Sequence, residues 1–227
     1  MPAQTITITE NYTAYLASPE SGHGPGIVLL QEIFGVNAVM REIADGFAAA
    51  GFVALVPDLF WRIAPGVELT DKSDAEWQEA FGLMKRFDIA QGIGDAQTAI
   101  SHLRNEVNGK VGTVGYCLGG LLAYLTATRT DTDAAVGYYG MNIQKFLGEA
   151  SNIKKPLLLH VAGKDEYHPA EAQKEVAEGL APFPLVTIQT YPEMNHAFVR
   201  PGGAHFDKAN ADLANGRTIT FFRQHLG

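Results

Sequence analysis

The stretch from Val111 to Tyr124 constrains the fold of this chain more than any other segment. It reads V-G-T-V-G-Y-C-L-G-G-L-L-A-Y, a short apolar run of β-type residues followed at once by a helix-like run. Gly115 and Gly119 flank Cys117 in a G-x-C-x-G pattern, which is typical of a nucleophile elbow with cysteine in the usual place of serine. At such a sharp strand-to-helix turn a flanking Cβ collides with neighbouring backbone, so glycine is expected on both sides.

Cys117 alone permits two interpretations. In the first, the helix that begins at the elbow directs backbone N–H groups and the positive end of its dipole at the sulfur, which favours the thiolate. In the second, the residue is an inert buried hydrophobe in a tight strand–helix contact, as free cysteines usually are. Acid and base partners elsewhere in the chain must decide between them.

Composition narrows the class of protein. The 227 residues are 46% hydrophobic and 19% charged, which predicts one globular domain spanning residues 1–227. A net charge of −8 without a basic block argues against nucleic acid or an anionic membrane as a partner. The single cysteine excludes an intrachain disulfide and a C-x-x-C pair. No leader or membrane-length apolar run is evident, so we expect a cytoplasmic protein, either a monomer or a small homo-oligomer.

Apolar runs of strand length alternate with helical patterns along the whole chain. This alternation predicts an α/β fold with a mostly parallel central sheet flanked by helices on both faces. The expected strands are residues 5–9, 12–16, 26–31, 52–56, 110–115, 134–138, 156–161 and 185–190.

Several helix starts carry capping signals. Asn37 is expected to cap a helix that stops at Gly51, and Ser73 to Glu76 form a capping box in which both side chains bond first-turn N–H groups. Pro169 is expected in the first turn of a later helix. The polar stretch 61–71 between these elements is expected to be an insertion or lid loop.

An acid and a histidine follow later strands in the order that nucleophile chemistry needs. Asp165 comes after the expected strand 156–161, and His196 comes after 185–190. Both therefore belong at the carboxyl edge of the sheet, with Cys117. The order nucleophile, acid, histidine is that of α/β-hydrolases. His196 would hold the thiol proton and Asp165 would fix its tautomer, while the N–H groups of Leu118 and Ile33 would form the oxyanion hole.

Several motifs together make the chain similar to the dienelactone hydrolase family (carboxymethylenebutenolidases). They are Q-E-I-F-G-V-N at 31–37, G-Y-C-L-G-G at 115–120, Y-Y-G at 138–140, G-x-D at 163–165 and H-x-F-x-R at 196–200. The resemblance implies the α/β-hydrolase fold and a Cys117–Asp165–His196 triad. It also implies that Glu32 contacts the resting thiol and exchanges a proton with it when substrate binds, and that Arg200 anchors a substrate carboxylate.

The position of Glu32 in the chain also suggests a role without the family resemblance. A carboxylate at the carboxyl end of a central apolar strand lies at the rim that holds the nucleophile, where burial favours its protonated form. The alternative is a structural glutamate that satisfies a loop N–H.

Two positions depart from the family pattern. The resemblance leads us to expect an arginine and, four residues later, a tyrosine on the helix after the lid loop, but Trp77 and Phe81 stand there. Both would line the pocket and disfavour a second carboxylate, or they pack the helix onto the core and point away.

The favoured function is a cysteine hydrolase of a small lactone or activated ester carrying one carboxylate. A non-catalytic ligand-binding protein on a hydrolase scaffold and a thiol redox protein are the alternatives, and the latter lacks a resolving cysteine. No cofactor is expected, and no His, Asp or Glu cluster has metal-ligand spacing.

Overall fold

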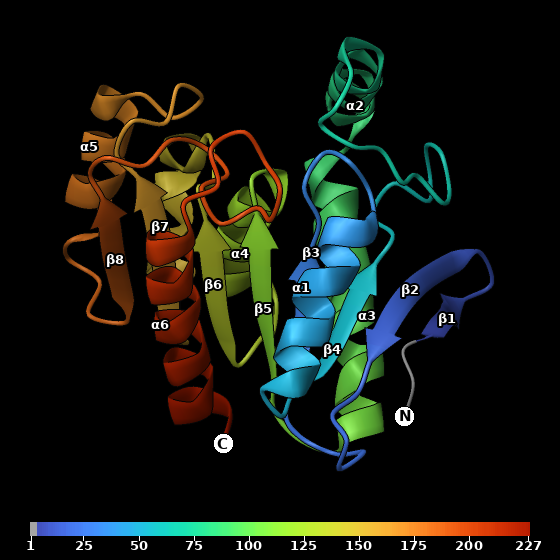
Figure 1. Ribbon diagram of the computed structural model, residues 1–227. Helices are drawn as coiled ribbons and strands as arrows, with labels where there is room; N and C mark the ends of the chain where they lie inside the picture. The colour runs from blue at the N-terminus through green and yellow to red at the C-terminus, as the bar shows by residue number, and fades with distance from the viewer. Residues whose placement is uncertain (1–3) are drawn as a thin grey trace.

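A computed structural model describes residues 4–227. Eight strands form one sheet in the order β1-β2-β4-β3-β5-β6-β7-β8 (Figure 1). The β1–β2 and β2–β4 pairs are antiparallel and all other pairs are parallel, which confirms the mostly parallel sheet. The strands are β1 (Gln4–Thr9), β2 (Tyr12–Ala17), β3 (Gly26–Leu30), β4 (Val53–Pro57), β5 (Val111–Tyr116), β6 (Ala134–Tyr138), β7 (Leu157–Ala162) and β8 (Val186–Tyr191).

Helices cover both faces of the sheet. α1 and α6 lie on the face toward the viewer in Figure 1, and α3 and α4 lie behind it, with α5 beyond them against the 3-10 helix η1. This two-sided cover explains why the central strands are apolar along their whole length. The helical elements are α1 (Ala38–Ala49), α2 (Asp74–Arg86), α3 (Ile89–Val107), α4 (Leu118–Arg129), η1 (Ile143–Asn152), α5 (Ala170–Leu180) and α6 (Lys208–Leu226).

The predicted caps are partly confirmed. Asn37 accepts a hydrogen bond from the Met40 N–H and so begins α1 as expected. Ser73 likewise accepts from the Glu76 N–H at 3.4 Å. The reciprocal half of the capping box was wrong, because the Glu76 carboxylate accepts from the Thr70 N–H, which precedes the helix.

Two further differences concern helix boundaries. Pro169 is the N-cap of α5 rather than a residue of its first turn. The 3-10 helix η1, of which only Ile143 and Ala150 are buried, was not predicted from the sequence. Runs of 3-10 helix longer than three or four residues are uncommon, so a ten-residue one is not expected from a sequence pattern.

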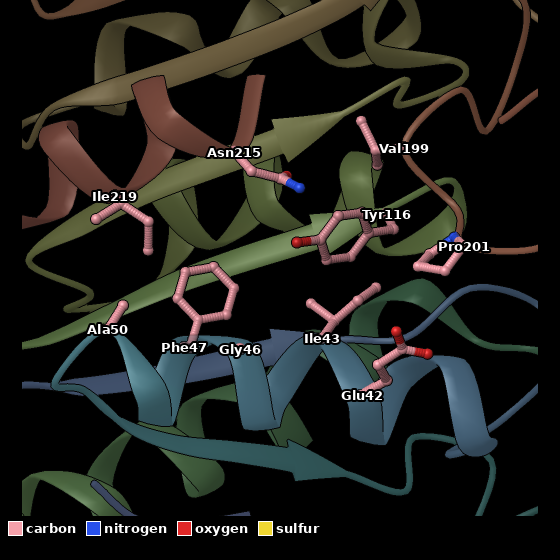
Figure 2. A pocket seen from close by; sticks show the side chains of 10 residues that line it. All are labelled: Glu42, Ile43, Gly46, Phe47, Ala50, Tyr116, Val199, Pro201, Asn215 and Ile219. Carbon is pink, nitrogen blue, oxygen red and sulfur yellow. The ribbon is translucent and has the colours of Figure 1, made fainter. Parts of the chain in front are cut away.

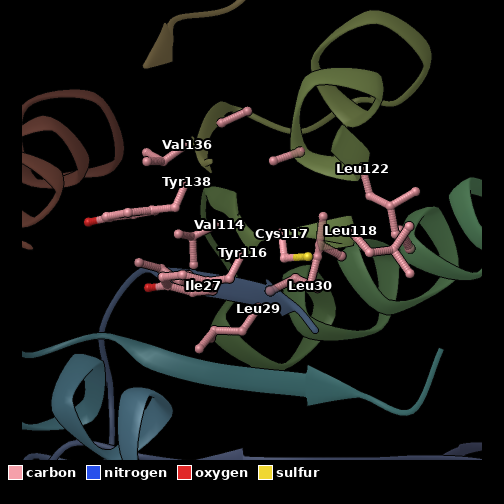
Figure 3. Close-up of a cluster of buried hydrophobic side chains, with 14 of the residues drawn as sticks. Ile27, Leu29, Leu30, Val114, Tyr116, Cys117, Leu118, Leu122, Val136 and Tyr138 are labelled. Atoms are coloured by element: carbon pink, nitrogen blue, oxygen red, sulfur yellow. The ribbon is translucent and has the colours of Figure 1, made fainter. Parts of the chain in front are cut away.

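The strands β3 and β5 run side by side in the middle of the buried core. Leu30 and Val114 of these strands and Leu118 and Leu122 of α4 are buried there, and Cys117 lies among them (Figure 3). The nucleophile candidate is thus held by the rigid centre of the molecule. None of the helices within residues 4–227 combines the length and apolar character that crossing a bilayer requires.

The predicted lid loop is anchored at both of its ends. Near its start, the Trp61 indole N–H donates to Asp95 at 3.0 Å, while just before its end the Leu69 N–H donates to the Phe34 carbonyl at 2.9 Å. These bonds fix where Asp71 and α2 lie. Both reach the edge of the sheet at which β3 ends.

Candidate active site

Cys117 lies at the turn between β5 and α4 with a strained backbone, at φ 57° and ψ −112°. The flanking glycines are required by contact. A Cβ on Gly115 would lie 1.8 Å from the Gly119 carbonyl oxygen, and one on Gly119 would lie 2.0 Å from the Leu30 oxygen. A side chain at either glycine would therefore collide with the backbone, as the G-x-C-x-G pattern predicted.

His196 and Asp165 meet at the same edge of the sheet. Nδ1 of His196 lies 2.7 Å from Oδ2 of Asp165, and the other carboxylate oxygen accepts the Tyr167 N–H at 2.9 Å. Both side chains are buried. Because Asp165 occupies Nδ1, Nε2 is the ring nitrogen available to the cavity that His196 and Cys117 both line.

The charge of His196 is governed by its neighbours. Burial alone would lower its pKa, but the Cys117 charge and the hydrogen bond to Asp165 raise the pKa from 6.5 to about 10. A raised pKa favours the imidazolium form of His196. His196 therefore stabilises the fold at low pH and loses that contribution as the pH rises through about 10.

Removing the sulfur should change this titration. In Cys117→Ala the pKa of His196 is expected to fall below the wild-type value of about 10, because the largest favourable influence on the imidazolium is gone. An NMR titration of the imidazole nitrogens in both proteins measures the shift. The other six histidines serve as internal controls, and an unchanged His196 curve would contradict the pairing.

Glu32, Arg200 and Asp71 form a buried ionic chain beside Cys117. Arg200 donates from Nε to Glu32 at 2.8 Å and from Nη1 to Asp71 at 3.0 Å. The Tyr139 hydroxyl donates to the second oxygen of Glu32 at 3.4 Å. The family resemblance led us to expect Glu32 against the thiol, but its hydrogen bonds within residues 4–227 go to Arg200 and Tyr139.

Arg200 is held as a cation at the pocket wall. Burial opposes its charge, yet Glu32 and then Asp71 keep its pKa above the ordinary value. Its guanidinium also lies 4.9 Å from the Phe34 ring centroid. No acceptor within residues 4–227 takes the N–H groups of Nη2, so one edge of the guanidinium is available to a ligand.

A small cavity brings these groups together. Trp77 and Phe81 of α2 line it, with their ring centroids 5.5 Å apart, so both face the site rather than pointing away from it. Tyr167 also lines it and sets its ring edge-on to His196 at 4.9 Å. The remaining lining residues are Ile33, Phe34, Met84, Cys117, Met141, His196 and Arg200.

Two backbone donors near the nucleophile are unpaired. The N–H groups of Ile33 and Leu118 donate to no acceptor in the described part of the chain, although both residues are buried. Leu118 is the first residue of α4, where N–H groups have no partner within the helix and are free to bond a ligand. These are the two donors that the sequence assigned to an oxyanion hole.

Comparison with known proteins decides the family. The sequence model described as "Dienelactone hydrolase family" matches residues 12–226. The chain belongs to the dienelactone hydrolase family. A carboxymethylenebutenolidase of Pseudomonas putida is 40% identical over 212 residues, covering 92% of this chain and 90% of that protein. A protein of Azospirillum brasilense, provisionally named as a carboxymethylenebutenolidase, is 47% identical over 221 residues, covering 96% and 95%.

Solved structures agree with this membership. A crystal structure from Klebsiella pneumoniae subsp. pneumoniae, provisionally described as a dienelactone hydrolase, superimposes with a TM-score of 0.87. It is 26% identical and covers 98% of both chains. As a member of the dienelactone hydrolase family, the chain has the α/β-hydrolase fold and is a hydrolase that acts on ester or lactone bonds.

Some site residues were not identified from the sequence. Asp71 was assigned only to the lid loop, and Tyr167 was not singled out although it follows Asp165 by two positions. Met84 and Met141 carry no signal that separates a pocket wall from a core contact. Within residues 4–227, no group of three His, Cys, Asp or Glu side chains is placed to hold a metal ion.

Proposed function

We propose that this family member hydrolyses a small lactone or activated ester with Cys117 as nucleophile, His196 as proton carrier and Asp165 as its orienting partner. One observation carries the proposal: Cys117 and His196 line one cavity while Asp165 occupies the far nitrogen of the imidazole. Such a chain of nucleophile, base and orienting acid is the general arrangement for covalent acyl transfer.

In the first half of the reaction the Cys117 thiolate attacks the carbonyl carbon. A C–S bond forms and the carbonyl π pair moves to oxygen, where the N–H groups of Ile33 and Leu118 would stabilise the oxyanion. Collapse of this intermediate breaks the C–O bond, and His196 gives its proton to the departing oxygen. In a lactone, that oxygen stays attached to the thioester as an opened chain.

In the second half, water attacks the thioester. His196, now neutral, takes a proton from the water, the C–S bond breaks, and Cys117 leaves as a thiolate. The starting imidazolium and thiolate are thereby restored. A thiolate expels a poor alkoxide weakly, so an enolate or similarly stabilised leaving group suits Cys117 better than a simple alkoxide.

The Glu32–Arg200 ion pair provides a way to sense a substrate carboxylate. A carboxylate that binds the free edge of Arg200 competes with Glu32 for the same cation. Glu32, once displaced, can take the proton from any Cys117 that still carries one, which leaves the attacking thiolate. Asp71 keeps its own bond to Arg200 and holds the guanidinium in place during the exchange.

The wall opposite Arg200 favours an apolar group. Trp77 and Phe81 offer aromatic faces, and the indole N–H of Trp77 already donates to the backbone carbonyl of Asp71 at 3.3 Å. A substrate anion placed there would lose hydration without gaining a partner. The substrate class that fits is therefore a lactone with one carboxylate at the Arg200 end and a ring or alkyl group at the other.

Substitution of Arg200 should reveal this polarity. We expect Arg200→Ala to lower kcat/KM for the carboxylated lactone about 10- to 100-fold more than for a matched neutral lactone, because a charge-assisted bond is lost. The ratio of kcat/KM for the two lactones is used because any loss of activity from leaving Glu32 and Asp71 unpaired affects both substrates alike. Arg200→Lys keeps the positive charge but loses the two-pronged guanidinium. Its preference for the carboxylated lactone should lie between those of wild type and Arg200→Ala.

Trp77→Arg tests the opposite wall in the same assay. It should improve kcat/KM for lactones whose carboxylate lies at the α2 end, relative to wild type. The substrate assignment would be overturned by a carboxylate preference that survives Arg200→Ala unchanged.

A further inference from the structure

A second, larger groove lies between α1 and α6, with a volume of about 260 Å³ (Figure 2). It shares no lining residue with the cavity at Cys117. Its walls are mostly apolar and come from both helices and from the loop after β8. The apolar lining residues are Ile43, Phe47, Ala50, Val199, Pro201 and Ile219. A concave, mostly apolar lining with a few polar groups is typical of small-molecule pockets.

Tyr116 provides a polar group at the floor of the groove. Its side chain is almost entirely buried, at 2% exposed, and its hydroxyl points into the groove (Figure 2). No hydrogen bond joins this hydroxyl to another residue within residues 4–227, so it is free to donate to a molecule in the groove. Burial, and then the charge of Glu32, raise the pKa of Tyr116, so it is a neutral donor.

Asn215 adds a second donor. Its amide oxygen accepts the Tyr138 hydroxyl at 3.1 Å, which leaves the amide nitrogen without an acceptor among the described residues. Figure 2 shows that the nitrogen is turned into the groove near Tyr116. Asn215 is exposed at the rim of the groove, so two donors without a protein partner face the same space and could both bond a ligand oxygen.

The charge of the groove selects against anions. Glu42, at the mouth, is the one ionisable carboxylate among the lining residues, and no lysine, arginine or histidine lines the groove. Glu42 forms no ion pair within residues 4–227. A carboxylate or phosphate would therefore meet repulsion without a compensating cation.

We propose that this groove binds an uncharged small molecule with a flat apolar body and a carbonyl group. The carbonyl oxygen accepts from Tyr116 and Asn215, and the body lies between Phe47 and Ile219. The site is separate from the ester chemistry but adjoins it, since Tyr116 precedes Cys117 and Val199 precedes Arg200 along the chain.

Prodan, a neutral naphthyl ketone whose emission reports polarity and hydrogen bonding, is the probe. The full chain is first alkylated at Cys117 so that the catalytic cavity is blocked. We expect saturable binding of one prodan per chain with a blue shift, and Tyr116→Phe should weaken it about fivefold through the lost hydrogen bond. The parent 2-dimethylaminonaphthalene, which lacks the carbonyl, should bind both proteins equally.

Gly46→Leu locates the site. Gly46 lines the groove, and a Cβ added there meets nothing within 4 Å. The side chain of a leucine at this position should therefore occupy space in the groove. It should weaken prodan binding more than about tenfold. Gly94→Leu, on α3 behind the sheet, is the matched control because its Cβ also meets nothing; it should leave binding unchanged.

Several outcomes would overturn the proposal. They are the absence of saturable binding, binding that Gly46→Leu does not weaken, and equal affinity for the anion 6-dimethylamino-2-naphthoate. A dimer that Gly46→Leu dissociates, with no prodan bound to either form, would show instead that the groove is covered by a second copy of the chain.

Discussion

Gly119→Ala is expected to destabilise the protein by about 3 kcal/mol, which lowers Tm by roughly 6–12 °C for a chain of this size. The added Cβ would lie 2.0 Å from the Leu30 carbonyl oxygen and 2.8 Å from that of Gln31. Both are backbone atoms at the end of a central strand, so relief requires β3 and α4 to separate. Activity should fall as well, because Cys117 is positioned by the same turn.

Gly94→Ala supplies the matched control. It makes the same substitution inside α3, where a Cβ has nothing within 4 Å. Alanine is the better helix former there, so Tm should rise slightly, by the equivalent of about 0.5–1 kcal/mol. Thermal unfolding of the three proteins measures both effects. A Gly119→Ala protein as stable as Gly94→Ala would show that the turn does not depend on this close approach.

The fold and the positions of Cys117, Asp165 and His196 were predictable because they depend on short sequence patterns and on the order of the strands. The G-x-C-x-G pattern could be interpreted because its glycines avoid collisions with backbone atoms that lie a few residues away or on one neighbouring strand. Asp165 and His196 were found because parallel strands deliver the residues after them to one edge. Neither inference required knowledge of how distant loops pack.

The ionic chain through Arg200 was not predictable in the same way. Its partner Asp71 lies 129 positions away, in a loop whose course is set by bonds to Phe34 and Asp95. Sequence patterns do not encode such contacts between irregular segments. The unpaired hydroxyl of Tyr116 was missed for a related reason, since it depends on the spacing of α1 and α6.

Cys117→Ala should lower kcat/KM for a good lactone or activated ester at least about 1,000-fold while Tm stays close to that of wild type. Without the sulfur no covalent intermediate forms, and only the oxyanion hole and substrate binding remain. The substitution removes one atom at the end of the core and adds none, so the turn can keep its geometry. Retention of activity within about tenfold would exclude Cys117 as the nucleophile.

Cys117→Ser provides the stricter comparison. In the proposed mechanism a serine hydroxyl must lose its proton during attack, whereas the cysteine is a thiolate beside the His196 imidazolium before substrate arrives. Serine should therefore rescue only a small part of the activity. Wild-type turnover by the serine protein would show that neither His196 nor Glu32 is adapted to a thiol.

The most direct measurement is to trap the acyl-enzyme. Wild type and Cys117→Ala are mixed with p-nitrophenyl acetate, quenched in acid within the first turnovers, and analysed by intact mass and peptide mapping. The account predicts one added acetyl group in wild type, on the peptide that contains Cys117, and none in Cys117→Ala. Turnover of the ester with the acetyl group on another residue, or on none while Cys117→Ala keeps its activity, would contradict it.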